Sequence, residues 1–313
     1  IHRNRDEGWS KTHYGPYGLH NAAGLDRPAG PTVLIWGDSY VEAHQVDDDQ
    51  KMDHLVTEAL AGRRRGPTRA VAVGRAYWSI ADYYFFLPRY ERLFQPTCHF
   101  IVLAEDGLKD LCPDGKTFLV EPTYAFVERT IVDARKSRAI AGLYEYGLSD
   151  VVLAPWKAVR TVMKDVRTAR FTLGPVAPPE PEDFVDTEAV LFAAATPQRL
   201  TESWAFAIDK LKSITDIPIV FVLVPELPVL KDGRVCFDDP QTPWRSSLVK
   251  LLADKHVACI DMTEILIEDY RRTGQFSRGF HRGRPDLGHF NARGHRLVAQ
   301  QICAYLDQRA CGE

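Results

Sequence analysis

The chain has no Cys-x-x-Cys pair, no internal repeat and no apolar run long enough to cross a membrane. Its six cysteines are scattered singly, which excludes a recognisable zinc ribbon or thiol redox motif and leaves the redox compartment open. A transmembrane helix needs about 20 predominantly apolar residues in succession. We therefore expect no membrane span in these 313 residues.

An excess of charge of one sign is also missing. The net charge is −3, so there is no electrostatic reason to expect nucleic acid as a partner. The one compact basic run, Arg63–Arg65, lies between Gly62 and Gly66 and is typical of a solvated loop. With 45% hydrophobic and 26% charged residues, the composition is that of a globular protein, and the length fits a single α/β domain (1–313) with insertions.

Short apolar runs alternate with helical patterns along much of the chain. Five runs are predicted to be strands, at residues 33–36, 69–74, 98–104, 217–224 and 257–261. Helices are predicted at residues 45–60, 77–93 (broken or kinked near Pro88), 197–213, 244–254, 263–273 and 292–307. Such alternation indicates crossover units and a parallel sheet. The expected fold is a flavodoxin-like three-layer α/β/α sandwich with strand order 2-1-3-4-5.

Two segments depart from this alternation. Residues 1–30 are polar and punctuated by glycine, without a period of 2 or 3.6, so we expect a strap on the surface. Residues 110–197 carry helical patterns at about 125–146 and from Val152 to Val166, and a proline-rich connector at 174–182. We interpret 110–197 as a mostly helical insertion within the domain.

The first strand runs into Gly37-Asp38-Ser39. Gly37 can adopt backbone angles that a side chain forbids, which favours a sharp bend there. A serine between a strand's carboxyl end and a helix lies where open α/β sheets bind ligands. The plainer alternative is that Asp38 or Ser39 only caps a helix. The acidic run Asp47–Asp49 is interpreted as the favourable start of that helix.

A second polar block precedes the last predicted helix. Asp286-x-x-His289 is followed by Phe290-Asn291-x-x-Gly294-His295, and Asn291 is a natural N-cap. Together with Gly37-Asp38-Ser39 near the start, this block resembles the SGNH (GDSL-type) hydrolase superfamily. The resemblance follows most of the chain in order, although only the two blocks are sharp.

The resemblance implies a site. Ser39 would be the nucleophile, His289 its base and Asp286 the partner of that base. The oxyanion hole would take the backbone amides of Ser39 and Gly74 and an asparagine side chain after the third strand. Here the sequence differs, because that asparagine is missing. Asp106 is the best match, with Lys109 as a second candidate, and an ionised Asp106 would repel an oxyanion. No cofactor is implied.

Other roles fit several of these residues less well. His281, Asp286, His289 and His295 could form a metal site, but their spacing fits no standard one, and His295 is more typical of a surface or packing residue. Val41 stands where Gly-x-Ser-x-Gly requires glycine, which argues against an ordinary α/β-hydrolase. Six aromatic residues fit a core better than a sugar platform: Trp36, Trp78, Tyr83, Tyr84, Phe85 and Phe86.

Two functions remain open from the sequence. The first is a serine esterase or O-acyltransferase that forms an acyl-Ser39 intermediate, acting on a small-molecule or glycan ester and by analogy on O-acylated carbohydrate. The second, motivated by the missing asparagine, is a catalytically weakened SGNH-fold carbohydrate-binding module. We expect an extracytoplasmic protein, periplasmic or secreted, with a cytoplasmic location as the alternative.

Overall fold

The computed structural model describes residues 2–4, 8–13, 19, 31–61, 69–76, 78–104, 119–120, 125–126, 197–239, 242–280 and 285–310. The chain forms two compact units, one of residues 1–124 and 195–313 and one of residues 125–194. The predicted helical insertion at 110–197 falls almost entirely outside the described residues. Within it the structure describes two short strands, β6 (Leu119–Val120) and β7 (Ala125–Phe126). The single-domain organisation stays a prediction.

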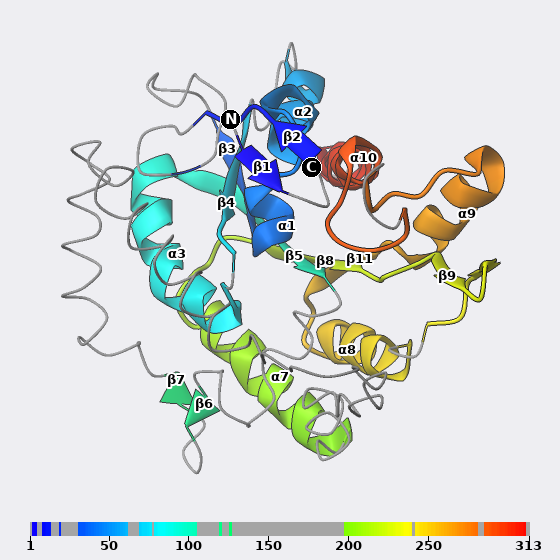
Figure 1. The fold of residues 1–313 in the computed structure, drawn as a ribbon. Helices are drawn as coiled ribbons and strands as arrows, with labels where there is room; N and C mark the ends of the chain where they lie inside the picture. The colour runs from blue at the N-terminus through cyan, green and yellow to red at the C-terminus, as the bar shows by residue number, and fades with distance from the viewer. Residues whose placement is uncertain are drawn as a thin grey trace, which may run out of the picture. The chain divides into compact units, whose positions relative to one another are not determined.

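A five-stranded parallel sheet forms the centre of the first unit (Figure 1). Its strands in spatial order are β4 (Arg69–Gly74), β3 (Thr32–Gly37), β5 (Pro96–Ala104), β8 (Ile219–Val224) and β11 (Ala258–Asp261). Numbered along the chain these are strands 2-1-3-4-5, so the predicted order is confirmed. The apolar runs are continuous because helices cover both faces of the sheet.

Helices lie on both faces of this sheet (Figure 1). The described helices of the first unit are α1 (Ser39–Glu42), α2 (Met52–Leu60), α3 (Ile80–Phe94), α7 (Pro197–Lys212), α8 (Thr242–Asp254), α9 (Thr263–Thr273) and α10 (Ala292–Ala310). Ile35 of β3 belongs to the core shared with α2, α9 and α10. The next residue, Trp36, packs on Tyr83 of α3, with ring centroids 6.0 Å apart. This alternation along β3 confirms the three-layer sandwich.

The segment after Ser39 differs from the predicted helix at 45–60. A single turn, α1, ends at Ala43 in the left-handed conformation, and a 3-10 turn, η2 (Asp48–Gln50), precedes α2. The interpretation of Asp47–Asp49 as the start of the helix after Ser39 is therefore wrong, because α2 begins only at Met52 and the acidic run belongs to the separate turn η2. Asp47 and Asp48 instead accept hydrogen bonds from the backbone N–H groups of Lys11 (2.6 Å) and His13 (2.9 Å).

Those two bonds fasten the described part of the N-terminal strap. The strap also contains two short antiparallel strands, β1 (His2–Asn4) and β2 (Gly8–Ser10), which its lack of periodicity did not predict. Such short strands hold few side chains on either face, so a period of 2 cannot be seen in them.

Helix α3 runs through Pro88 without a break, so of the two predicted alternatives, a break or a kink, the break is wrong. Its buried residues Tyr83, Leu87 and Tyr90 keep the helix on the sheet, which offsets the roughly 3 kcal/mol that a proline costs inside a helix. A hairpin of β9 (Val229–Lys231) and β10 (Arg234–Cys236) was not predicted, although its Asp-Gly turn is a recognised hairpin signal. None of the described helices could cross a membrane.

Candidate active site

Ser39 is the first residue of α1, just beyond the carboxyl end of β3. Asp38 caps this turn, because its Oδ1 accepts a hydrogen bond from the backbone N–H of Tyr40 at 2.9 Å. The capping interpretation of Gly37-Asp38-Ser39 therefore holds for Asp38. It leaves the hydroxyl of Ser39 available for other chemistry at the sheet edge where ligands bind in such folds.

Two glycines allow α1 to lie directly against the strand ends. Gly37 of β3 pairs with Gly74 of β4 in the parallel register. A Cβ on Gly37 would lie 2.3 Å from Val41 Cγ2, and one on Gly74 would lie 2.7 Å from the backbone nitrogen of Glu42. Gly37 does not have a positive φ. Its predicted role as a bend is thus replaced by a steric one, the close approach of α1.

His289 reaches the serine from the other end of the chain. Its Nε2 lies 2.9 Å from Ser39 Oγ, although 250 residues separate the two. The imidazole ring also packs on the ring of Tyr40, with centroids 5.2 Å apart. The structure therefore brings together two of the predicted site residues at hydrogen-bond distance, the geometry that a nucleophile and its base require.

Asp286 lies three residues before His289 and is 1% exposed. Its Oδ2 accepts a hydrogen bond from the backbone N–H of Leu230, in β9, at 2.7 Å. A buried carboxylate needs such partners because it has lost its hydration. The unpredicted hairpin therefore fixes Asp286 next to the segment that carries the imidazole.

The loop after β4 is fixed beside Gly74, one of the predicted oxyanion donors. The buried Glu42 accepts a hydrogen bond from the backbone N–H of Ala76 at 2.8 Å. The backbone N–H of Arg75 donates to the carbonyl of Gly37 at 3.3 Å. Asp106 and Lys109, the candidates for the third donor, lie outside the described residues, so that part of the hole stays a prediction.

His295, the second histidine of the block, lies apart from the serine chemistry. It is 1% exposed, so it is a packing residue and not a surface one. Neither ring nitrogen has a hydrogen-bond partner within the described part of the chain. Burial, together with smaller contributions from the charges of Lys51 and His289, lowers the pKa of His295 to about 3. His295 is therefore neutral over the ordinary pH range.

The metal reading involved His281, which lies outside the described residues. Within the described ranges, no three His, Cys, Asp or Glu side chains are grouped so that they could hold a metal ion.

The aromatic residues fall into two groups. Trp36 and Tyr83 are buried in the core, whereas Trp78 and Phe86 are partly exposed and stacked, with ring centroids 4.8 Å apart.

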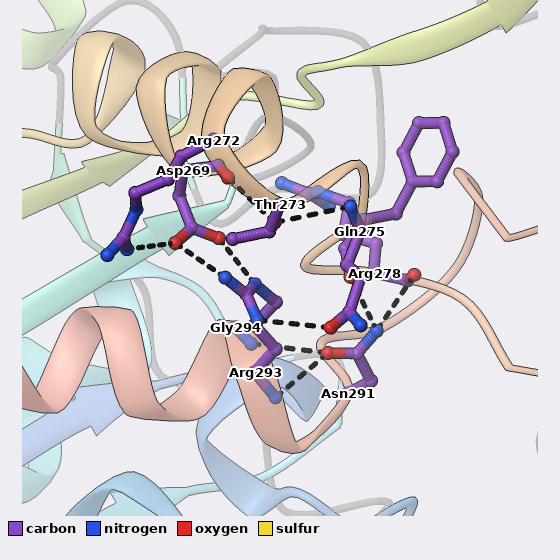
Figure 2. Close-up of polar contacts among 9 residues, drawn as sticks. Asp269, Arg272, Thr273, Gln275, Arg278, Asn291, Arg293 and Gly294 are labelled. Carbon is purple, nitrogen blue, oxygen red and sulfur yellow. Dashed lines mark hydrogen bonds and ion pairs between the residues drawn. The ribbon is translucent and has the colours of Figure 1, made fainter.

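Asn291 fastens a loop to the start of α10, as Figure 2 shows. Its Oδ1 accepts a hydrogen bond from the backbone N–H of Arg293 at 2.9 Å, the predicted N-cap role. Its Nδ2 also donates to three carbonyls of the loop, those of Phe276 (2.9 Å), Arg278 (3.1 Å) and Gly279 (3.3 Å). Asn291 therefore links the loop at residues 276–279 to the first turn of α10, directly after His289 and Phe290.

Gly294 makes room for the same loop. A Cβ at this position would lie 2.3 Å from the carbonyl oxygen of Ser277. Arg293, the residue before Gly294, forms an ion pair with the carboxylate of Asp269 in α9. The same carboxylate forms a second ion pair with Arg272 (Figure 2). These pairs hold the pKa of Asp269 below its usual value, chiefly through the hydrogen bond from Arg293.

Tyr40 and Arg278 were not singled out from the sequence. The Tyr40 hydroxyl contacts the carbonyl of Gly288, 248 positions away, and the Arg278 guanidinium contacts the Tyr40 hydroxyl, 238 positions away. An arginine in a loop rich in glycine and arginine carries no signal that it will be buried. The Leu230 contact was missed for a related reason, because a backbone N–H has no sequence signature.

Comparison with known proteins found no matching family model and no matching curated protein. Among solved structures, the chain is similar to a lipase/acylhydrolase from Enterococcus faecalis (14% identity, TM-score 0.45), covering 90% of this chain and 97% of that one. It is also similar to the esterase EstA from a Pseudoalteromonas species (9% identity, TM-score 0.43, 91% and 100% covered). A catalytic mutant of an acetylxylan esterase from Geobacillus stearothermophilus has 10% identity and a TM-score of 0.43, with 89% and 94% covered.

Proposed function

We propose that this protein is a serine esterase or O-acyltransferase that works through an acyl-Ser39 intermediate on O-acylated carbohydrate. The observation that carries the proposal is the 2.9 Å contact between Ser39 Oγ and His289 Nε2 at the carboxyl edge of the sheet. A serine hydroxyl is a weak nucleophile until a neighbouring base accepts its proton. The 2.9 Å contact between the two groups supports such a transfer.

In the proposed first step, Ser39 Oγ attacks the ester carbonyl carbon while its proton moves to His289 Nε2. The carbonyl π electrons move to oxygen, and the backbone amides of Ser39 and Gly74 would stabilise this oxyanion. The intermediate then collapses, the bond to the leaving alkoxide breaks, and His289 returns the proton to that alkoxide. An acyl-Ser39 ester remains.

In the second step, His289 takes a proton from the incoming group as that group attacks the acyl carbon. The intermediate collapses, the bond from the acyl carbon to Ser39 Oγ breaks, and His289 returns the proton to Ser39 Oγ. Water gives hydrolysis and a sugar hydroxyl gives transfer, and the same constellation serves both. Asp286 is proposed to orient His289 and to stabilise its protonated form. Its burial and its bond from Leu230 support this role, because both restrict where the carboxylate can lie.

The O-acylated carbohydrate rests on the family resemblance of the sequence, as does an extracytoplasmic location. Turnover of a small aryl acetate tests the reaction type, and release of acetate from O-acetylated glycans tests the substrate class. Ser39→Ala should abolish both. Release of acetate without transfer to an added oligosaccharide would favour hydrolysis, and acetylated oligosaccharide among the products would favour transfer.

The donors of the oxyanion hole distinguish the proposed enzyme from the alternative function, a carbohydrate-binding module. Loss of one donor typically lowers the rate by about 10²–10³. If Asp106 is charged in the asparagine position, Asp106→Asn should raise aryl ester turnover well above wild type. Unchanged turnover in both Asp106→Asn and Asp106→Ala would remove Asp106 from the hole and make Lys109 the next candidate. Inert proteins that still bind acylated glycans would favour the binding module.

A further inference from the structure

We propose that Tyr40 and Arg278 are positioning residues that hold the imidazole of His289 against Ser39, an inference that rests on the proposed function. Tyr40 follows Ser39 in α1, and its hydroxyl donates a hydrogen bond to the carbonyl of Gly288 at 3.1 Å. Gly288 is the residue directly before His289. A side chain next to the nucleophile thus holds the backbone that carries the base.

Arg278 determines which way the Tyr40 hydroxyl points. Its Nη1 donates a hydrogen bond to the hydroxyl oxygen of Tyr40. A phenolic hydroxyl has one proton to donate, and it accepts through its oxygen lone pairs. Because the arginine can only donate, the proton of Tyr40 is left to the Gly288 carbonyl. The charged donor also strengthens that second bond by polarising the hydroxyl.

Arg278 is itself held in place from several sides. It is 2% exposed, and its Nη2 donates to the carbonyl oxygen of Pro225, just after β8, at 2.6 Å. The guanidinium lies over the rings of Tyr40 and Phe290, 5.1 and 5.2 Å from their centroids. The partly exposed Glu226 lies 3.8 Å from Nη1 and compensates part of the charge. Buried charge is tolerated only with such partners.

The backbone of His289 is held on its other side as well. The backbone N–H of Gly279 donates to the carbonyl of His289 at 3.1 Å, and Arg278 pairs with Phe290 in an antiparallel bridge. The carbonyls on both sides of the His289 α-carbon are therefore fixed. The ring of Tyr40 then limits the imidazole to the orientation in which Nε2 meets Ser39 Oγ.

Tyr40→Phe tests this inference because it keeps the ring contact and removes only the hydroxyl. The matched control is Tyr305→Phe, which removes a hydroxyl from α10 and keeps a ring packed on Phe100. Misplacement of a reacting group by about 1 Å can lower a rate about a hundredfold. We expect Tyr40→Phe to lower kcat for an aryl acetate about tenfold, with KM changed less than about twofold, and Tyr305→Phe to change neither.

A second readout does not require activity. In protein labelled with ¹⁵N-histidine, with His289 assigned by its loss in His289→Gln, wild type and Tyr305→Phe should show one imidazole tautomer for His289. Tyr40→Phe should show a mixture. Arg278→Met should resemble Tyr40→Phe, and Arg278→Lys should lie between it and wild type, because lysine donates without the planar fork.

The proposed function and the positioning role of Tyr40 and Arg278 can be refuted independently of each other. A wild type that turns over no ester and takes no serine-directed label refutes the proposed function, and the NMR comparison still decides the positioning role. Unchanged kcat and an unchanged His289 tautomer in Tyr40→Phe would overturn that role. A rise of about tenfold in KM without a fall in kcat would also overturn the positioning role, because it would place Tyr40 in substrate binding.

Discussion

The two halves of the candidate site are held in place by different physical means. On the Ser39 side, position is set by contact: two paired glycines let α1 lie against the ends of β3 and β4, with predicted Cβ clashes of 2.3 and 2.7 Å if either were replaced. On the His289 side, an irregular segment is fixed by hydrogen bonds to its backbone from Tyr40 and Gly279.

Substitutions in the two halves should therefore affect stability and activity differently. Overpacking beside α1 moves the backbone of Ser39, the proposed nucleophile, so stability and activity should fall together. Removing one hydrogen bond near His289 leaves the rest of the segment attached, so activity should be more sensitive than stability.

The largest effect is expected for His289, the proposed base. His289→Ala should lower aryl ester turnover by at least about a thousandfold, because it removes the imidazole that lies 2.9 Å from Ser39 Oγ and would accept its proton. The control is His54→Ala, a histidine on α2 that pairs with Glu58. Steady-state kinetics of both variants checks the assignment. Comparable losses in the two would point to general destabilisation instead.

Gly74→Ala tests the steric half. The new Cβ would meet the backbone of Glu42, so α1 must shift, and we expect a loss of about 1–3 kcal/mol in unfolding free energy with a fall in kcat. Gly274→Ala serves as the comparison. Its φ of +67° makes alanine strained, but the Cβ would meet nothing within 4 Å. Urea denaturation should show loss in both, and kinetics should show loss only in Gly74→Ala.

Asn291 separates helix capping from loop anchoring. Asn291→Ala removes the cap and three bonds to loop carbonyls, so we expect about 2 kcal/mol of destabilisation and a lower kcat. Asn291→Ser keeps a capping oxygen but cannot span the loop. It should regain about 1 kcal/mol in denaturation experiments without regaining kcat. Full recovery of kcat in the serine variant would contradict a role for the loop.

The smallest effect concerns His295 and pH. The unfolded side chain titrates near 6.5, and burial lowers its pKa in the folded state to about 3. Below pH 6.5 the unfolded chain therefore binds a proton that the folded chain does not, and wild type loses up to about 1.4 kcal/mol of stability per pH unit. His295→Leu lacks this loss and should become relatively more stable as the pH falls.

Denaturation of both proteins from about pH 7 to about pH 5 measures this difference. Asp53 has the opposite sign, because burial raises its pKa to about 6 and the folded state holds its proton longer as pH rises from 3.8. That contribution is common to wild type and His295→Leu, so it cancels in the comparison. A stability difference that does not change with pH would show that His295 titrates normally in the folded protein.

Much of the fold follows from the sequence because its strands are short buried runs between helices. Order and direction of the five strands agree with the prediction. The helix expected at 45–60 begins only at Met52, because an apolar period cannot show the separate turns at Ser39 and Asp48. The hairpin β9–β10 was missed although its Asp-Gly turn was readable.

Within the site, short motifs located Ser39 and His289 but not what holds them. Arg278 and Tyr40 meet across 238 residues, and Tyr40 and Gly288 across 248. No local pattern reports such contacts. Gly37 was recognised for a reason that the structure replaces, since the close approach of α1 requires glycine there without a positive φ.

Covalent labelling of Ser39 tests the central claim most directly. Wild type is treated with a serine-directed fluorophosphonate, digested, and the modified peptide is identified by mass spectrometry. The proposed chemistry predicts one adduct, on Ser39, that is absent in Ser39→Ala and forms far more slowly in His289→Ala. An adduct that persists in Ser39→Ala and maps to another serine, or equal labelling rates with and without His289, would contradict it.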